Sequence, residues 1–250
     1  MANVWDAGSA KLIASLGFEA LATTSSGHAA TLGRLDGSVT REEALRHAAS
    51  IVGATGLPVS ADFENGFGDD PEEVAEAVRL AAEAGLAGCS VEDYSRDHDE
   101  IYELERGRER IAAAAEVARQ GPRRIVLTAR AENFVCGRPD LPDTIARLQA
   151  YEEAGADVLF APGLVTAQDI REVVSSVQLP VNVLALAGVP PVAELAEMGV
   201  SRVSVGGAFA FAALGALLEA AGELRDQGTF GYLDRAHAGS RAAEDTFTSR

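Results

Sequence analysis

The amino-acid sequence predicts an α/β fold, a (β/α)8 (TIM) barrel formed by one domain spanning residues 1–250. Short apolar runs alternate with longer stretches of helical spacing, a pattern typical of βα units around a parallel sheet. Eight such runs occur, which favours a closed barrel over an open sheet, and ~250 residues is the usual length of this fold. Gly85, Gly155 and Gly199 mark helix ends just before a new run.

The strands are predicted where β-branched and other apolar residues form a short run. The first run begins almost at residue 1, so we expect no preceding segment to cover the bottom of the barrel. The tail after Gly228, or another subunit, would have to cover it. The predicted strands are 3–5, 21–24, 59–61, 88–91, 125–129, 158–160, 181–184 and 202–205.

Helix start signals lie between several of these strands. Ser9 precedes the first predicted helix, Thr40 and Glu43 form a capping box, and Asp70 with the proline after it opens another helix. Further helices are predicted at 101–119, 141–154, 167–176, 192–198 and 209–227.

The final segment, 228–250, is polar and rich in Ala, Ser and Arg from Tyr232 onward. We expect either a C-terminal helix that is swapped between subunits or a disordered tail. The sequence leaves both interpretations open.

Composition excludes several functions. The net charge of −17 argues against a nucleic-acid partner, because such binding depends on Lys and Arg. Lys11 is the only lysine and lies in the opening helix, which argues against Schiff-base and pyridoxal phosphate chemistry. The 4 histidines are not spaced as a metal-binding pair, so zinc is not expected.

The two cysteines, Cys89 and Cys136, lack a metal-binding or disulfide pattern. We expect Cys89 to be a core residue, Cys136 to be a bystander, and both to be reduced thiols in the cytoplasm. No apolar stretch reaches the ~20 residues of a membrane span, and no signal pattern opens the chain. We therefore expect a soluble protein with no membrane partner.

Acidic residues follow two of the predicted strands. Asp62 and Glu64 are two residues apart, so on a continuing strand they share one face, and Glu92 ends the next strand. The carboxyl ends of barrel strands face the active site. Three carboxylates there predict a site for Mg²⁺ or Mn²⁺, with the alternative that these acids cap helices or pair with arginine.

Arg130 closes the predicted strand 125–129, where a bidentate carboxylate partner, either a substrate or Glu132, would satisfy it. The Thr24–Gly27 stretch could donate to a substrate carboxylate, or it could be a plain loop. Asp36, in the loop after the second strand, could be a base, could position water, or could be a solvated acid.

The order of motifs along the chain resembles the isocitrate lyase/phosphoenolpyruvate mutase superfamily, and the resemblance covers nearly the whole sequence. The motifs are Asn3-Val-Trp-Asp-Ala, Ala22-Thr-Thr-Ser-Ser-Gly, Leu32-Gly-Arg-Leu-Asp36, Asp62-x-Glu64-x-Gly-Phe-Gly68, Val91-Glu92-Asp93, Ala129-Arg130, Phe160-Ala-Pro-Gly, Val181-Asn182-Val-Leu and Val203-Ser-Val-Gly-Gly.

This resemblance implies a barrel enzyme, usually a tetramer of helix-swapped dimers, that binds Mg²⁺ and a small anionic 2-oxo acid or its enolate. We therefore expect a homotetramer or homodimer. The implied roles follow the motifs: metal shell for Asp62, Glu64 and Glu92; substrate carboxylate for Thr24, Ser25 and Ser26; substrate oxygens for Arg130; a substrate-side amide for Asn182; and the catalytic loop aspartate for Asp36.

One loop departs from the superfamily's patterns. Isocitrate and methylisocitrate lyases carry Lys-Lys/Arg-Cys-Gly-His after the Glu-Asp pair, and the mutase carries a lysine directly after it. In this chain the loop begins at Tyr94 and has neither cysteine nor lysine. Arg96 and His98 are either substitute residues of a loop, 94–103, that closes over the substrate or solvated loop residues.

The resulting hypothesis is a Mg²⁺-dependent lyase. It would cleave a C–C bond of a small 2-oxo or 2-hydroxy di- or tricarboxylic acid through an enolate, with oxaloacetate-like or alkylmalate-like substrates. Two alternatives stay open: a mutase or hydrolase that breaks a P–C bond of a phosphonopyruvate-like substrate, and a non-catalytic barrel that serves as a binding or assembly partner.

Overall fold

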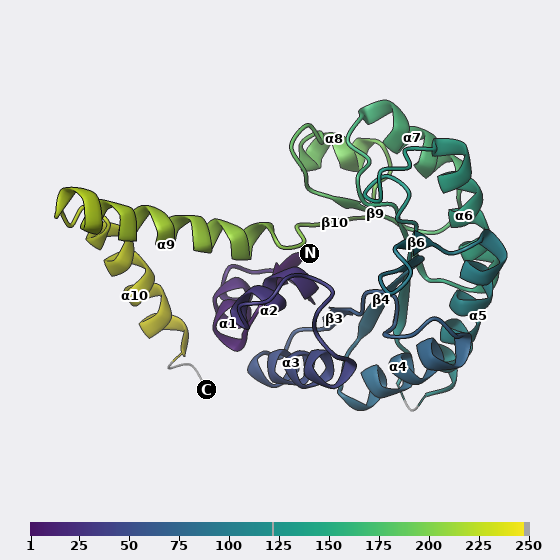
Figure 1. Ribbon diagram of the computed structural model, residues 1–250, viewed down its shortest axis with the longest axis horizontal. Coiled ribbons are helices and arrows are strands. Elements are labelled where there is room, and N and C mark those ends of the chain that lie inside the picture. The colour runs from purple at the N-terminus through teal and green to yellow at the C-terminus, as the bar shows by residue number, and fades with distance from the viewer. Residues whose placement is uncertain (122, 248–250) are drawn as a thin grey trace.

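The computed structural model describes residues 1–121 and 123–247. Eight parallel strands form a nearly closed barrel in the order β1-β2-β3-β4-β7-β8-β9-β10, as the sequence predicted (Figure 1). A two-stranded hairpin, Tyr94–Ser95 (β5) with Glu100–Ile101 (β6), lies outside it. The barrel strands are Ala2–Val4 (β1), Leu21–Thr23 (β2), Val59–Asp62 (β3), Gly88–Glu92 (β4), Val126–Arg130 (β7), Val158–Phe160 (β8), Val181–Leu184 (β9) and Arg202–Ser204 (β10).

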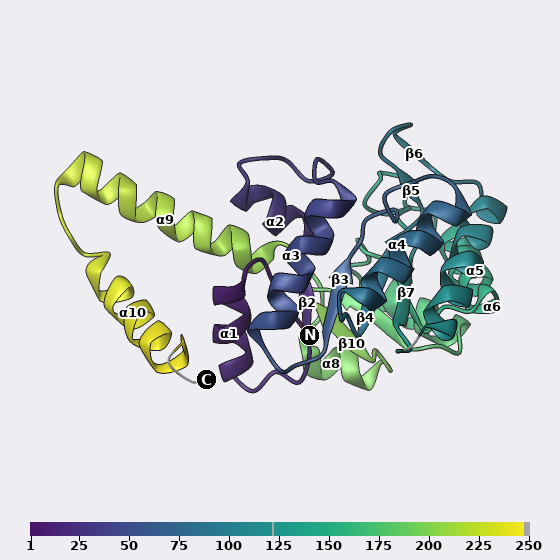
Figure 2. The same cartoon turned by 90° about the horizontal axis from the view of Figure 1, so that it is seen from below.

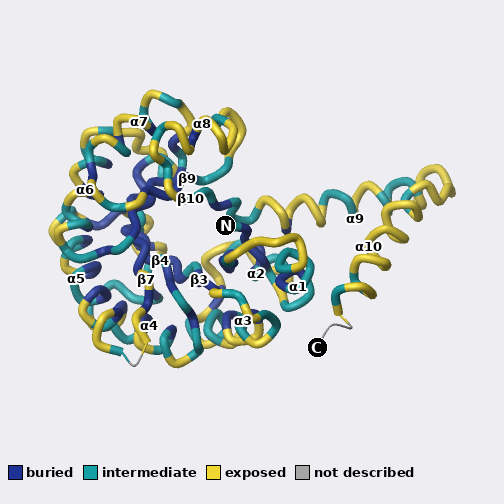
Figure 3. Tube along the Cα trace, turned by 180° about the vertical axis from the view of Figure 1, so that it is seen from behind, coloured by how far each residue is buried: buried dark blue, intermediate teal, exposed yellow. Residues whose placement is uncertain are grey.

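Helices surround the strands, and the buried residues concentrate in the strands and on the inner faces of the helices (Figure 3). Each strand contributes apolar residues to the core, and polar or charged residues such as Asp62, Glu92 and Arg130 lie at the carboxyl ends of several strands. The helices are Ala7–Ser15 (α1), Ser25–Thr31 (α2), Arg41–Ala54 (α3), Pro71–Glu83 (α4), Leu104–Gln120 (α5), Leu141–Ala154 (α6), Ala167–Ser176 (α7), Val192–Glu197 (α8), Ala208–Gln227 (α9) and Leu233–Phe247 (α10).

Three sequence predictions need correction. Asp6, not Ser9, caps α1: Ser9 is the third helical residue and completes a capping box with Asp6. The helix predicted from residue 101 begins at Leu104, because residue 101 belongs to the β5–β6 hairpin. The stretch 24–27 is not the plain loop that the sequence left as one alternative, since Thr24 accepts from the backbone N–H of Gly27 and caps α2.

Asn3 links the first and last strands of the barrel. Its side-chain oxygen accepts from the backbone N–H of Val205 at 2.9 Å and of Gly206 at 3.1 Å. Its side-chain amide donates to the Thr23 carbonyl at 2.7 Å. One buried side chain on β1 therefore bridges the last strand to β2 and brings the strand ends around a common interior.

The C-terminal helices do not cover the barrel. Helix α9 projects away from it, and α10 turns back toward α1, so the two form an arm (Figures 1 and 2). Only Ala210 of α9 is buried. Of the predicted segment 228–250, residues 233–247 are helical, and the last three residues lie outside the described part of the chain.

Candidate active site

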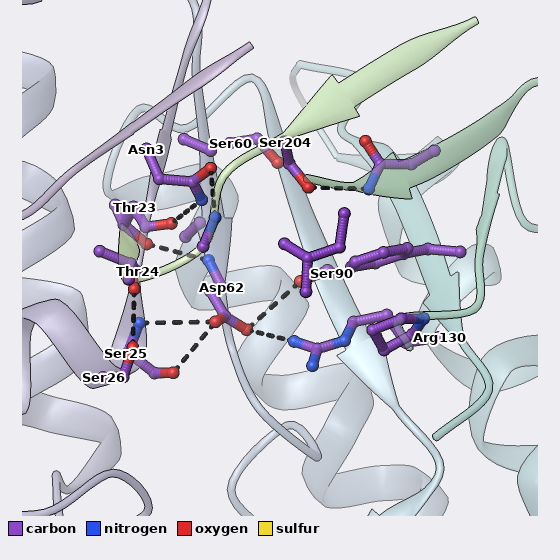
Figure 4. A pocket seen from close by; sticks show the side chains of 18 of the residues that line it. Asn3, Thr23, Thr24, Ser25, Ser26, Ser60, Asp62, Ser90, Arg130 and Ser204 are labelled. Carbon is purple, nitrogen blue, oxygen red and sulfur yellow. Dashed lines mark hydrogen bonds and ion pairs between the residues drawn. The ribbon is translucent and has the colours of Figure 1, made fainter. Parts of the chain in front are cut away.

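The carboxyl ends of the strands surround a cavity of about 200 Å³. All the residues predicted for the site line it except Glu64, which lies beside it. Hydroxyl, carboxylate and guanidinium groups from different strands point toward one another there (Figure 4). The predicted residues that line it are Thr24, Ser25, Ser26, Asp36, Asp62, Glu92, Arg130 and Asn182.

Arg130 is the hub of the acidic cluster. Its Nη1 lies 2.8 Å from Asp62, its Nη2 2.9 Å from Glu92, and its Nε 2.9 Å from Glu132. The sequence predicted that the carboxylate partner of Arg130 is either a substrate or Glu132. The structure shows Glu132 and two further acids in this role. Burial lowers the pKa of Arg130, but these three carboxylates outweigh it and raise that pKa well above its usual range.

Asp62 is oriented from two neighbouring elements. Its Oδ2 accepts from the Ser25 hydroxyl at 3.0 Å, and its backbone N–H donates to the Thr23 hydroxyl at 2.9 Å (Figure 4). Register explains the arrangement, because β3 pairs in parallel with β2 and the first turn of α2 begins at the end of that strand. The carboxylate is thereby aimed into the cavity.

Glu64 departs from the simple strand geometry. It follows the end of β3 in a left-handed backbone conformation, with φ of 48°, which is uncommon for a residue with a side chain. Glu64 is buried, and burial raises the pKa of its carboxyl to about 7. Its carbonyl accepts from the Glu92 backbone N–H at 2.8 Å, which ties the two acids together.

Arg96 reaches back from the hairpin to this rim. Its Nε lies 2.9 Å from Glu64, and its Nη2 lies 3.2 Å from Asp36 and 3.8 Å from Glu92. Arg96 is therefore a site residue rather than a solvated one. His98, by contrast, is 63% exposed and pairs with Asp69 at 3.2 Å, away from the cavity.

Asp93 supports the site from behind. It is buried, and it accepts from Tyr151 at 2.6 Å, from Arg147 at 3.2 Å and from the Glu132 backbone N–H at 2.8 Å. The adjacent acids of the Glu-Asp pair therefore have different positions, since successive side chains of an extended chain point to opposite sides. Glu92 faces the cavity and Asp93 anchors the neighbouring helices.

The floor of the cavity lies deeper in the barrel. Asn182 accepts from Arg202 Nε at 2.8 Å and donates to the Ser204 hydroxyl at 2.9 Å. The sequence interpretation missed Arg202, although a charged residue opening the apolar strand 202–205 was a usable signal. Cys89 is buried, as predicted. Cys136 lines a neighbouring cavity together with Glu92 and Arg130, and its expected role as a bystander stays a prediction.

Comparisons with known proteins agree with this site. The model of the phosphoenolpyruvate phosphomutase family matches residues 1–225. A solved Burkholderia cenocepacia J2315 protein, named as a candidate lyase/mutase, is 53% identical, with a TM-score of 0.93, over 96% of this chain and 89% of that one. The oxaloacetate decarboxylase of Ectopseudomonas mendocina (strain ymp) is 31% identical over 235 residues, 90% of this chain and 79% of that protein.

A phosphonopyruvate hydrolase solved with oxalate and Mg²⁺ is 26% identical, with a TM-score of 0.82, over 94% of this chain and 84% of that one. The family model and these relatives each span most of the described barrel. The chain therefore belongs to the phosphoenolpyruvate phosphomutase family and is an enzyme of the isocitrate lyase/phosphoenolpyruvate mutase superfamily.

Proposed function

We propose that this enzyme is a divalent-cation-dependent lyase that cleaves a C–C bond of a small 2-oxo diacid, with oxaloacetate as the leading substrate. The observation that carries the proposal is the cavity of about 200 Å³, lined by carboxylates, hydroxyls and three arginines, with no lysine or cysteine among the described residues that line it. Such a site suits an acid that loses CO₂ by an enolate route. The relationship to an oxaloacetate decarboxylase supports the same substrate.

Asp62, Glu64 and Glu92 would hold Mg²⁺ or Mn²⁺. Among residues 1–121 and 123–247, no three ligating side chains converge on one point. The set still fits Mg²⁺, which keeps several waters and needs only one or two carboxylates, because the acids offer oxygen ligands beside a cavity with room for water. When bound, the cation would supply a Lewis acid for the 2-oxo group and the charge of the enolate.

The protein's own groups would position the substrate. The hydroxyls of Ser25 and Ser26 face the cavity beside Asp62. Ser26 can donate to the carboxylate next to the 2-oxo group, and Ser25 would do so by turning its hydroxyl from Asp62 to the substrate. Arg130 would keep its carboxylates aligned and add positive charge near the developing negative charge. When the C–C bond breaks, its electrons form the enolate and CO₂ leaves. Asp36, which lines the cavity, would then orient the water or donor that protonates carbon.

A P–C bond cleavage is the second candidate. The placement of Asp36 at the cavity favours it, as does the relationship to a phosphonopyruvate hydrolase. Tyr94 counts against it, because the lysine that follows the Glu-Asp pair in the mutase is absent.

A screen of pyruvate or glyoxylate release tests the proposal. Oxaloacetate, alkylmalates and phosphonopyruvate are compared with Mg²⁺ and with EDTA, each against a protein-free blank containing the same Mg²⁺. We expect oxaloacetate cleavage that requires the cation and that falls about 100-fold or more in Asp62→Asn. Glu172→Gln on the outer helix α7 is the matched control. Release of phosphate from phosphonopyruvate alone would favour the P–C reaction, and no metal-dependent activity on any substrate would refute both.

We also infer a homodimer or homotetramer in which α9 is exchanged. Phe211, Leu217 and Leu218 of α9 are 50%, 62% and 74% exposed, which is costly for an isolated chain. An apolar groove on the barrel, lined by Phe18, Val192 and Leu195 among others, could receive such a helix from a partner.

The cellular compartment is inferred from the two cysteines. No helix within the described residues is long and apolar enough to cross a membrane. Both cysteines are free thiols, which accords with a reducing compartment, and we infer the cytoplasm.

A further inference from the structure

Charge in the cavity is divided between two levels. At the rim, five carboxyl groups, those of Asp36, Asp62, Glu64, Glu92 and Glu132, surround two guanidinium groups, those of Arg96 and Arg130. At the floor, the hydrogen-bond partners of Arg202 are neutral, and the other charged group near it is the α-ammonium of Met1. The rim therefore attracts a cation, and the floor carries an uncompensated positive charge.

Arg202 reaches across the barrel interior. Its Nε donates to Asn182 at 2.8 Å, and its Nη2 donates to the Thr128 hydroxyl at 3.0 Å. Thr128 stands two residues before Arg130 on β7, and both side chains lie on the same face of that strand. The guanidinium of Arg202 thus contacts β7 one layer of side chains below the residue that carries the acidic cluster. Both levels line the same cavity.

The lack of an acid partner distinguishes Arg202 from Arg130 and Arg147; it is shared by Arg110, which donates to backbone carbonyls and does not line the cavity. Arg130 contacts three carboxylates, and Arg147 contacts Asp93 and Asp143. Within residues 1–121 and 123–247, no carboxylate forms an ion pair with Arg202. Burial lowers the pKa of Arg202 to about 10, which reflects the cost of a charge removed from water without a counter-ion.

Arg202 also retains free hydrogen-bond donors. A guanidinium has five N–H groups, and the two hydrogen bonds leave three of them unused. On Arg130, by contrast, Nε and both Nη atoms are each directed at a carboxylate. Arg130 keeps two unused N–H groups by the same count, but its three carboxylates would repel an incoming anion, whereas no carboxylate among the described residues pairs with Arg202.

We propose that Arg202, together with Ser204, is an anion-binding subsite that takes the remote carboxylate of the substrate and selects dicarboxylic over monocarboxylic 2-oxo acids. The inference rests on the proposed function for the identity of its ligand. A substrate so bound would span the cavity, with its 2-oxo end at the acidic rim and its second carboxylate at the floor. The fork geometry of arginine suits bidentate contact with that carboxylate.

Ligand binding distinguishes an anion-binding role of Arg202 from a purely structural one. Malonate is the dicarboxylate probe and acetate is the monocarboxylate probe. Melting temperature and calorimetric affinity are measured for the full-length protein with Mg²⁺ present and absent. The variants are Arg202→Met, Arg202→Lys and the exposed control Arg171→Met on α7.

If Arg202 is the subsite, Arg202→Met binds malonate at least about tenfold more weakly, as expected for a lost charge-assisted contact. Its melting temperature in anion-free buffer is equal to or above that of the wild type, because an unpaired buried charge has been removed. If Arg202 has a purely structural role, Arg202→Met instead has a lower melting temperature and unchanged malonate binding, and this result would overturn the inference. If Arg202→Met does not fold, Arg202→Lys decides: unchanged malonate affinity refutes the subsite, and weakened affinity supports it.

Turnover separates this inference from the proposed reaction. If malonate binding depends on Arg202 but no 2-oxo acid is cleaved, the subsite stands and the lyase proposal fails. If oxaloacetate is cleaved with Mg²⁺ and Arg202→Met keeps the wild-type KM and kcat, the lyase proposal stands and the subsite fails.

Discussion

Arg96 lies directly over Gly37, in the space that a side chain at residue 37 would occupy. A Cβ built on Gly37 would be 2.5 Å from the Arg96 Cδ. This contact allows Arg96 Nε to reach Glu64 at 2.9 Å and brings the hairpin and the loop that carries Asp36 together over the cavity. Gly37, in one loop, thus sets the position of the Arg96 guanidinium, which comes from another.

Gly37→Ala tests this packing. The methyl group would displace Arg96 from Glu64 and Asp36, so we expect kcat/KM to fall about tenfold or more, as happens when positioning groups shift. Steady-state kinetics on the substrate identified by the screen provides the measurement.

Gly33→Ala is the matched control for that substitution. Gly33 also has a positive φ, 67° against 81° for Gly37, but its Cβ would meet nothing within 4 Å. Both variants therefore carry a backbone cost of about 1 kcal/mol, and only Gly37→Ala moves Arg96. Equal kinetic losses in the two variants would contradict the role assigned to Arg96.

Arg130→Met should lower the free energy of unfolding by about 3–5 kcal/mol, because it leaves Asp62, Glu92 and Glu132 without their shared cation. Urea denaturation at pH 8 gives the value, with Arg119→Met, an exposed arginine, as the control. The loss should shrink at pH 5, where protons can replace the missing charge. A loss below about 1 kcal/mol at pH 8 would show that the hub contributes little to stability.

His47 should make the protein sensitive to mild acid. It stacks on His28 with ring centroids 3.7 Å apart and lies near Asp6, and burial lowers its pKa to about 4 from 6.5. As pH falls from 6.5 to 4, the unfolded chain takes up the proton first, so the stability of the fold decreases across that window. The loss attributable to this group approaches about 3 kcal/mol at the acid end.

His47→Gln should flatten that pH dependence, since glutamine keeps a donor for the Trp5 carbonyl, 2.8 Å away, but does not titrate. Urea titrations at pH 7 and pH 4.5 measure the difference between the two proteins. The exposed histidine of α10, His237, serves as the control when changed to Gln. A wild-type slope in the His47 variant would refute the assignment.

Leu218→Glu should dissociate the proposed assembly. Leu218 is 74% exposed on α9, and a carboxylate there could not be buried against a partner at low cost. Analytical ultracentrifugation should show a smaller species than for the wild type or for Gln168→Glu, which adds the same charge at an exposed position of α7. An unchanged sedimentation coefficient would exclude this face of α9 from the interface.

Much of the barrel follows from local sequence. The run 158–160 matches β8 and the spacing over 141–154 matches α6, because apolar periodicity and capping residues act within a few residues. The hairpin at Tyr94–Ile101 and the helix that begins at Ser25 were missed, since both lie in short polar stretches without a repeating apolar pattern. Their form depends on contacts with distant residues, such as the pairing of Ser25 with Asp62.

The sequence by itself determined which side chains meet at the barrel rim, because parallel strands separated by helices must end on the same side. It could not decide how their charges pair. Only the tertiary structure places Arg130 among three acids, turns Asp93 away from the cavity, brings Arg96 over Glu64, and leaves Arg202 without an acid. Ion pairing depends on distances across the barrel between residues such as Arg130 and Asp62, 68 positions apart in the chain, which local patterns do not encode.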